Sequence, residues 1–335
     1  MSNSIFAYGK GFEDLHEKFR NTFIKPKVKL VGNLVAPAFT KNYSLIGTAF
    51  DYLLRFNMEH MYPDKIIKDL EWGAKSSYDG VIKTIEKTNG SNISVGFLGD
   101  VAINKKELKK IITDKYESSE YHYKKYISDG LPTNDLMQSV LTLARLDTVS
   151  NGRFIDNFSL DESNEDIKDL FQLYGAINEQ GLKANNRVCL NPYFGEGSAI
   201  IGGSAGDLII DDTIIDIKTT IHLKLDLKYF YQVLGYYILS LIGGIYEDKE
   251  ASPINNIGIY FSRHSVLWKI NVNEIADSKT FSEFKKYFIN YAEERVWKPV
   301  KDDYNKSAKL DPEYAKLYPL AKLPMVSNWN YEPIS

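Results

Sequence analysis

Apolar side chains recur at steps of three and four residues through much of the first half of the chain. In residues 11–23, Phe12, Leu15, Phe19 and Phe23 follow this spacing, which is typical of one face of an amphipathic helix. The same spacing predicts helices at 44–62, 163–181, 226–242 and 280–297, and a mostly helical segment from 64 to about 150 that is broken at 89–92 and 129–134.

From Asn186 onward the pattern changes to short apolar runs bounded by glycine and polar residues, which predict strands. The first two runs, NRVCLNPYF and SAIIGGSAGDLII, would be joined by a turn at 195–197. A third strand, TIIDIKTT, follows, and NIGIYFSR and SVLWKINV form a hairpin around His264, which we expect at the surface. Helices followed by strands that alternate with helices indicate an α/β fold with a helical N-terminal part.

The pattern divides the chain into three parts. Residues 1–160 form a helical N-terminal region that includes the helical insertion at 64–150, and residues 161–300 form the α/β core. The last part, 301–335, is rich in proline, tyrosine and lysine, and we expect it to wrap the surface as a tail.

Composition and charge narrow the functional classes. A net charge of −3 and a pI of about 6 argue against a long basic tail that wraps nucleic acid, although a local basic groove remains compatible with them. No apolar run approaches the length of a membrane span, and the N-terminus lacks a signal-peptide core. Cys189 is the single cysteine, so no internal disulfide can form, and we expect a cytoplasmic location.

The stretch GDLIIDDTIIDIKTT, residues 206–220, places charges in two otherwise apolar strands. If Asp211 and Asp212 form a two-residue turn, Asp207 and Asp216 lie directly opposite each other, with Cβ atoms about 4.5–5.5 Å apart. Two carboxylates so close repel unless a divalent cation such as Mg²⁺ lies between them. Lys218, two residues on and on the same face, could then orient or deprotonate a water at that metal. A register slip of one residue would turn one aspartate away.

The alternative is a purely structural role, in which Asp207 and Asp216 are ordinary strand-end residues with Lys218 as their salt-bridge partner. For a short D…DxK pattern alone, this alternative would be favoured. The flanking apolar runs and a second motif in the next helix favour the functional interpretation.

Asp207 and the sequence DIK (216–218), followed by YQVLGYY in the next helix, resemble the PD-(D/E)XK nuclease superfamily, and Gln232 and Tyr236 match the QxxxY motif of its RecB-like branch. The resemblance implies a restriction-endonuclease-like core, a mixed central sheet flanked by helices. It also implies that Asp207, Asp216 and the Ile217 carbonyl bind Mg²⁺ or Mn²⁺, and that Lys218 positions the attacking water. Gln232 and Tyr236 would support the site or contact phosphate. Gly206 stands where the superfamily's proline would be.

Two further acids come into question through the resemblance. RecB-like nucleases often carry G-x-x-x-H-x-x-L in an early helix, and GTAFDYLL (47–54) has Asp51 where the metal-binding histidine would be. Asp51 either takes that role or pairs with Arg55 one helical turn on; the sequence leaves both open. The family also has an acid before the sheet. Glu179 is the nearest candidate, but it falls off the apolar stripe of its helix, so we expect a surface glutamate, and Glu165 is no better placed.

The resulting functional prediction is a divalent-metal-dependent nuclease that hydrolyses phosphodiester bonds, with DNA favoured over RNA, in DNA repair, restriction or phage defence. The helical insertion would shape substrate access or contact a protein partner, and no membrane is involved. Two alternatives stay open. One is a catalytically silent nuclease-like fold that binds nucleic acid or a protein; the other is a non-nuclease metal enzyme or ligand-binding protein, for which the sequence holds no nucleotide or cofactor motif.

Overall fold

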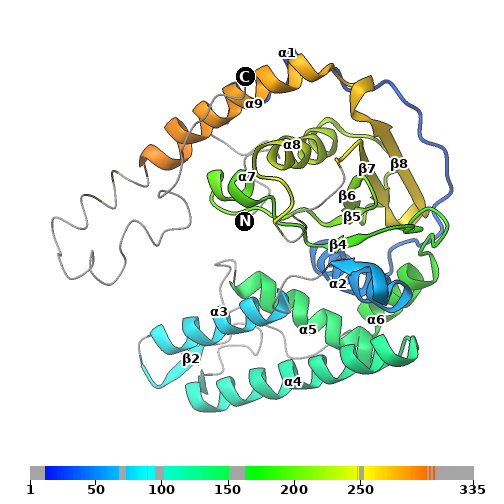
Figure 1. The fold of residues 1–335 in the computed structure, drawn as a ribbon. Coiled ribbons are helices and arrows are strands. Elements are labelled where there is room, and N and C mark those ends of the chain that lie inside the picture. Colours follow the sequence, from blue (N-terminus) through cyan, green and yellow to red (C-terminus); the bar gives the residue numbers. More distant parts are fainter. Residues whose placement is uncertain are drawn as a thin grey trace.

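A mixed sheet forms the centre of the fold in the computed structural model, which describes residues 12–67, 73–88, 90–94, 102–150, 163–246, 248, 253–299, 302 and 305 (Figure 1). In spatial order its described strands are β1 (Ile66–Ile67), β4 (Val188–Leu190), β5 (Leu208–Ile210), β6 (Thr213–Lys218), β7 (Asn256–Phe261) and β8 (Val266–Asn271). The pairs β1–β4 and β6–β7 are parallel, and the other neighbours are antiparallel. The mixed sheet agrees with the α/β class expected from the sequence.

Both faces of the sheet are covered, which explains why its central strands are rich in isoleucine. Because side chains alternate along a strand, Leu208 and Ile215 join the core under α2 (Tyr43–Met61), whereas Ile209 and Ile214 join the core under α8 (Leu227–Gly243). A strand buried on both faces has no polar side, so the runs are nearly continuous.

The remaining helices extend these two layers. The elements on the α8 side are α1 (Glu13–Thr22), α7 (Gly195–Ile200) and α9 (Ser278–Ala292), and those on the α2 side are α3 (Gly73–Lys87), α4 (Lys105–Asp129), α5 (Asn134–Ser150) and α6 (Asn164–Gly175). In Figure 1, α3, α4 and α5 lie together beyond α2, on the side away from α8. We call α3, α4 and α5 the helical lobe. A small β-hairpin of β2 (Asn92–Ser94) and β3 (Ala102–Asn104) joins α3 to α4.

The boundaries of the helical lobe follow from local chemistry. The side chain of Asn104 caps α4 by accepting the backbone N–H of Lys106, and Gly130 ends the helix in the left-handed conformation that glycine tolerates. The expected breaks near 89–92 and 129–134 are confirmed, since α3 ends before the first and α4 and α5 meet at the second.

Helices α7 and α8 cross in backbone contact. A Cβ atom on Gly197 would lie within 3.0 Å of the Leu239 carbonyl oxygen, and one on Gly243 would lie within 3.0 Å of the Phe194 carbonyl oxygen. Only glycine permits so close an approach, so these two residues fix where α8 rests on α7.

Some expectations need correction. Residues 195–200 form α7 rather than a turn and the start of a strand, and the glycines that follow, Gly202 and Gly203, have positive φ angles that end the helix before β5. The helix expected to reach 181 ends at Gly175. His264, expected at the surface, is buried in the turn between β7 and β8, where its Nδ1 lies 3.2 Å from the Asn33 carbonyl oxygen.

Other expectations are confirmed or fall outside the described residues. Helices at 44–62 and 226–242 and the hairpin of β7 and β8 are present, with the helix ends shifted by one residue. Residues 66–67, inside the segment expected to be mostly helical, form β1 of the central sheet. Apart from 302 and 305, the expected tail at 301–335 lies outside the described residues.

Candidate functional site

The hairpin of β5 and β6 has the register that its sequence predicts. Ile210 pairs with Thr213, Ile209 with Ile214 and Leu208 with Ile215. The turn is held by Asp211, which has a φ of 52° and a carboxylate that accepts the backbone N–H groups of residues 185–187. The ladder therefore stops just short of the two aspartates that the sequence places opposite each other.

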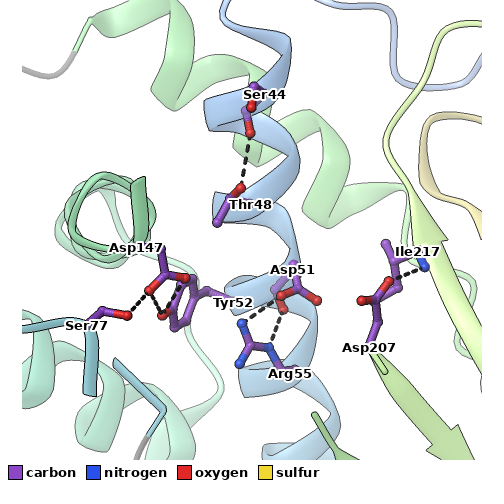
Figure 2. Close-up of polar contacts among 9 residues, drawn as sticks. All are labelled: Ser44, Thr48, Asp51, Tyr52, Arg55, Ser77, Asp147, Asp207 and Ile217. Carbon is purple, nitrogen blue, oxygen red and sulfur yellow. Dashed lines mark hydrogen bonds and ion pairs between the residues drawn. The ribbon is translucent and has the colours of Figure 1, made fainter. Parts of the chain in front are cut away.

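Asp207 precedes β5 and bonds across to β6 through its side chain. Its Oδ2 accepts the backbone N–H of Ile217 at 2.7 Å (Figure 2). In an extended strand the N–H and C=O of one residue point to the same side, so the Ile217 carbonyl also faces Asp207. This orientation is the one that a metal ligand at Ile217 requires.

Asp216 and Lys218 lie on the opposite face of β6 from Ile217, toward α8. The Nζ atom of Lys218 forms an ion pair with Oδ2 of Asp216 at 2.7 Å and donates to Oε1 of Gln232 at 3.0 Å. Gln232 in turn donates to the Tyr236 hydroxyl at 3.0 Å. The structure thus brings Asp216, Lys218, Gln232 and Tyr236 together in one buried chain of contacts.

Tyr229 belongs to the same group, although the sequence analysis did not single it out. Its ring centre lies 5.2 Å from Nζ of Lys218, a distance suited to a cation–π interaction. Tyr229, Gln232 and Tyr236 are three and four residues apart on α8, so the helical spacing was the signal that could have found it.

Asp51 approaches the hairpin from the other layer. Gly47, one turn before it on α2, lies beside Thr219, because a Cβ atom at Gly47 would be 3.9 Å from the Thr219 Cβ. In Figure 2 the carboxylates of Asp51 and Asp207 face each other. Asp51 also accepts Nη2 of Arg55 at 2.7 Å, so the two roles that the sequence left open are not exclusive.

The three carboxylates raise one another's pKa values. Burial raises the pKa of Asp51 to about 6, against the opposing effect of Arg55 and with a further contribution from Asp207. Burial and the Asp216 charge raise the pKa of Asp207 to about 6. The pKa of Asp216 is also raised, by burial first, although Lys218 opposes the shift. Burial is the largest cause of each shift, and the smaller contributions show that the carboxylates lie close enough to repel one another.

Lys218 remains a cation in this setting. Burial alone lowers the pKa of its ammonium, but the carboxylates of Asp216 and Asp207 outweigh burial, and the pKa lies above its ordinary value. The lysine is therefore suited to donating hydrogen bonds and stabilising negative charge, and it is a poor general base.

The site has an excess of carboxylate oxygen. Oδ1 of Asp216 and Oδ1 of Asp51 are buried without a hydrogen-bond partner among the described residues, and such groups are rare in folded proteins. Lys218 and Arg55 face the carboxylates of Asp51, Asp207 and Asp216. The excess of carboxylates over cations among these five side chains and the all-oxygen donors fit a hard divalent cation.

The carboxylates are not already gathered into a metal-holding cluster. Within the described ranges, no group of three or more His, Cys, Asp or Glu side chains has the arrangement that could hold a metal ion. The fit therefore rests on the unpartnered oxygens of Asp51 and Asp216, on Asp207 and on the Ile217 carbonyl. Glu179 and Glu165 are exposed and outside this group, as expected.

The molecule thus has an α/β fold with a mixed sheet, and its buried carboxylate–lysine site lies where β5 begins and β6 ends. Comparison with family models, with curated proteins and with solved structures gives no match. The likeness to PD-(D/E)XK nucleases thus rests on the residues described above. None of the described helices combines the length and apolar character needed to cross a bilayer.

Proposed function

We propose that this chain is a divalent-metal-dependent nuclease of the PD-(D/E)XK type that hydrolyses phosphodiester bonds, with DNA favoured over RNA. The observation that carries the proposal is the fully buried side chain of Asp216, whose Oδ1 has no hydrogen-bond partner in the described part of the chain. It lies beside the carboxylates of Asp51 and Asp207, whose pKa values are raised. Leaving a buried carboxylate oxygen unpaired costs about 1–3 kcal/mol, so a ligand for that oxygen gives the arrangement a purpose.

Asp207, Asp216 and the Ile217 carbonyl would hold Mg²⁺ or Mn²⁺, with Asp51 on the facing side. When bound, such an ion acidifies water and stabilises charge on a phosphoryl oxygen. Lys218 would orient the attacking water through its ammonium protons and offset charge that develops on the phosphate. Gln232 and Tyr236 keep that ammonium in place, because Gln232 bonds to both Lys218 and Tyr236.

The helical lobe supports a role in substrate access, since it packs on α2, the helix that carries Asp51. By analogy with the family, the biological setting is DNA repair, restriction or phage defence. The lobe is also the surface through which a protein partner would reach the site.

The test is Mn²⁺ binding by calorimetric titration, with cleavage assays on linear and circular duplex DNA, single-stranded DNA and RNA. We expect Asp216→Ala to lose both Mn²⁺ binding and cleavage. Asp226→Ala is the matched control, because Asp226 also pairs with a lysine two residues away, at 2.9 Å from Lys224, but with 34% of its side chain exposed. Equal Mn²⁺ binding by wild type and Asp216→Ala would overturn the site. Nucleic-acid or protein binding without any cleavage would favour the silent nuclease-like fold.

A further inference from the structure

A chain of polar contacts links the helical lobe to the proposed metal site. Asp147 on α5 accepts hydrogen bonds from Ser77 on α3 and from the Tyr52 hydroxyl on α2, the latter at 2.9 and 3.0 Å (Figure 2). One carboxylate therefore joins three helices at a single point.

The chain continues along α2 to Asp51. The Arg55 guanidinium lies over the Tyr52 ring, 4.3 Å from its centre, and donates from Nη2 to the Asp51 carboxylate and from Nε to the Asp51 carbonyl. Tyr52 is 2% exposed, so its ring can shift little beneath Arg55. The orientation of the Asp51 carboxylate thus depends on Arg55, and that of Arg55 depends on Tyr52.

Asp147 is an acidic residue in a mostly buried stretch of α5. It lies in a helix with the sequence SVLTLARLD, in which most of the other side chains are buried in the apolar core, and burial raises its pKa. Asp51 contributes to the same shift through repulsion. Its carboxylate is half-buried and accepts hydrogen bonds from hydroxyl groups on two other helices.

We propose that Asp147 and Tyr52 are positioning residues that act through Arg55 to hold the Asp51 carboxylate toward Asp207. The helical lobe is then part of the metal site's support rather than a passive addition. This inference rests on the proposed function, since it assigns the relay a role in binding the divalent ion.

The competing explanation is that the Tyr52–Asp147 bond only fastens the lobe to α2. The chain contains a matched control for this explanation. Tyr123 on α4 donates to Oε2 of Glu59 on α2 at 2.7 Å, which is also a tyrosine–carboxylate bond between the lobe and α2. Glu59 lies eight residues beyond Asp51, about 12 Å along the helix. Loss of the Tyr123–Glu59 hydrogen bond should therefore leave the proposed metal site unchanged.

The experiment measures Mn²⁺ affinity by calorimetric titration of the full chain, with thermal unfolding recorded on the same samples. Tyr52→Phe removes the hydroxyl and keeps the ring under Arg55. We expect it to weaken Mn²⁺ binding about tenfold, as is usual when an outer support of a metal ligand is removed. Tyr123→Phe should stay within about twofold of wild type in Mn²⁺ affinity, whatever it does to the melting temperature.

A second pair of variants keeps the test decisive if Tyr52→Phe does not fold. Asp147→Asn retains an acceptor for Tyr52 and Ser77, so it should keep most of the affinity, whereas Asp147→Ala should lose about as much as Tyr52→Phe. If Tyr52→Phe and Asp147→Ala bind Mn²⁺ like Tyr123→Phe in a chain whose wild type binds and cleaves, the relay is wrong and the nuclease assignment stands. A wild-type chain that binds no Mn²⁺ overturns both.

Discussion

Two buried ion pairs lie at the ends of neighbouring strands, and they differ in how completely they are bonded. Asp169 receives Nη1 and Nη2 of Arg263 at 2.7 and 3.1 Å and also the backbone N–H of Phe39. Both of these side chains are fully buried. Asp216 instead meets the single ammonium of Lys218, and its Oδ1 has no partner among the described residues.

The difference separates a pair with a fully bonded carboxylate from the pair that belongs to the proposed site. The planar fork of a guanidinium matches both oxygens of one carboxylate, whereas the three N–H groups of an ammonium point apart and bond to separate partners. The Asp169–Arg263 pair, tied further to the Ala36 carbonyl, fastens the segment before α2 to the turn after β7. In the Asp216–Lys218 pair, Oδ1 of Asp216 is left without a hydrogen-bond partner among the described residues and could bind a ligand.

Breaking the Asp169–Arg263 pair, in which both carboxylate oxygens are bonded, should have the largest effect on stability. Asp169→Ala leaves Arg263 as an uncompensated buried charge, which typically costs about 3–5 kcal/mol. Urea unfolding should show that loss, while Asp216→Ala, which relieves repulsion with Asp51 and Asp207, should cost much less. Similar losses for the two variants would remove the distinction between the pairs.

Removing the cation of the Asp216–Lys218 pair should lower the cleavage rate and have little effect on folding. Lys218→Ala should retain Mn²⁺ and nucleic-acid binding and lose about 10²–10³-fold in cleavage rate, the usual loss for one preorganised transition-state donor. Lys218→Arg should not rescue fully, because the guanidinium has a different shape and charge distribution.

The measurement for Lys218 is a cleavage time course on labelled duplex, with binding followed in Ca²⁺. Lys228→Ala is the control, since Lys228 contacts the same Tyr229 ring from an exposed position, 4.9 Å from its centre. Cleavage by Lys218→Ala at the wild-type rate would reduce DIK to a strand end with a salt bridge, and the nuclease assignment would fail.

The smallest expected effect is a change in how stability depends on pH. The pKa of Asp207 is about 6 in the folded chain, against an ordinary value of 3.8 that we take for the unfolded chain. As the pH falls, Asp207 therefore binds a proton in the folded chain before it does so in the unfolded chain. The free energy of unfolding of the metal-free protein should therefore receive a stabilising contribution from Asp207 as the pH falls from 7 to 4. Asp207→Asn should stabilise it on the order of 1 kcal/mol at pH 7.5 and have little effect at pH 4.5.

Thermal unfolding in EDTA at both pH values checks this prediction. Asp211→Asn is a useful contrast, because backbone N–H groups hold the pKa of Asp211 below its ordinary value despite partial burial. That substitution should destabilise at neutral pH. An Asp207→Asn variant that is less stable than wild type at pH 7.5 would contradict the repulsion argument.

Local sequence information predicted the hairpin and much of the site. The pairing of Ile209 with Ile214 follows from a two-residue turn between two apolar runs. Gln232, which the family resemblance singled out, bonds to both Lys218 and Tyr236. Asp51 was found through its place in the family's motif, four residues after Gly47, and its pairing with Arg55 through helical spacing. Each of these inferences uses residues within one hairpin or within about one turn of a helix.

The contacts that sequence analysis missed are distant along the chain. Tyr52 and Asp147 are 95 residues apart, and Arg263 and Asp169 are 94 apart. Hydrophobic periodicity records which face of a helix is buried, but not which residue of another helix it meets. His264 was misplaced for the same reason, since the segment that covers it, around Asn33, lies 231 residues earlier.

The crossing of α7 and α8 has a consequence for the tolerance of the site to mutation. Gly243 lies eleven residues, or about 16 Å, from Gln232 along α8. A helix behaves as a stiff rod over that length, so a side chain that pushes the helices apart at Gly197 or Gly243 would tilt or twist the whole rod. The amide of Gln232 would then leave the Lys218 ammonium, although nothing near it had been altered. Gly197 and Gly243 thus set the position of Gln232 from the far end of α8. A screen for variants that lose the proposed cleavage should find these two residues, although they lie away from the proposed site.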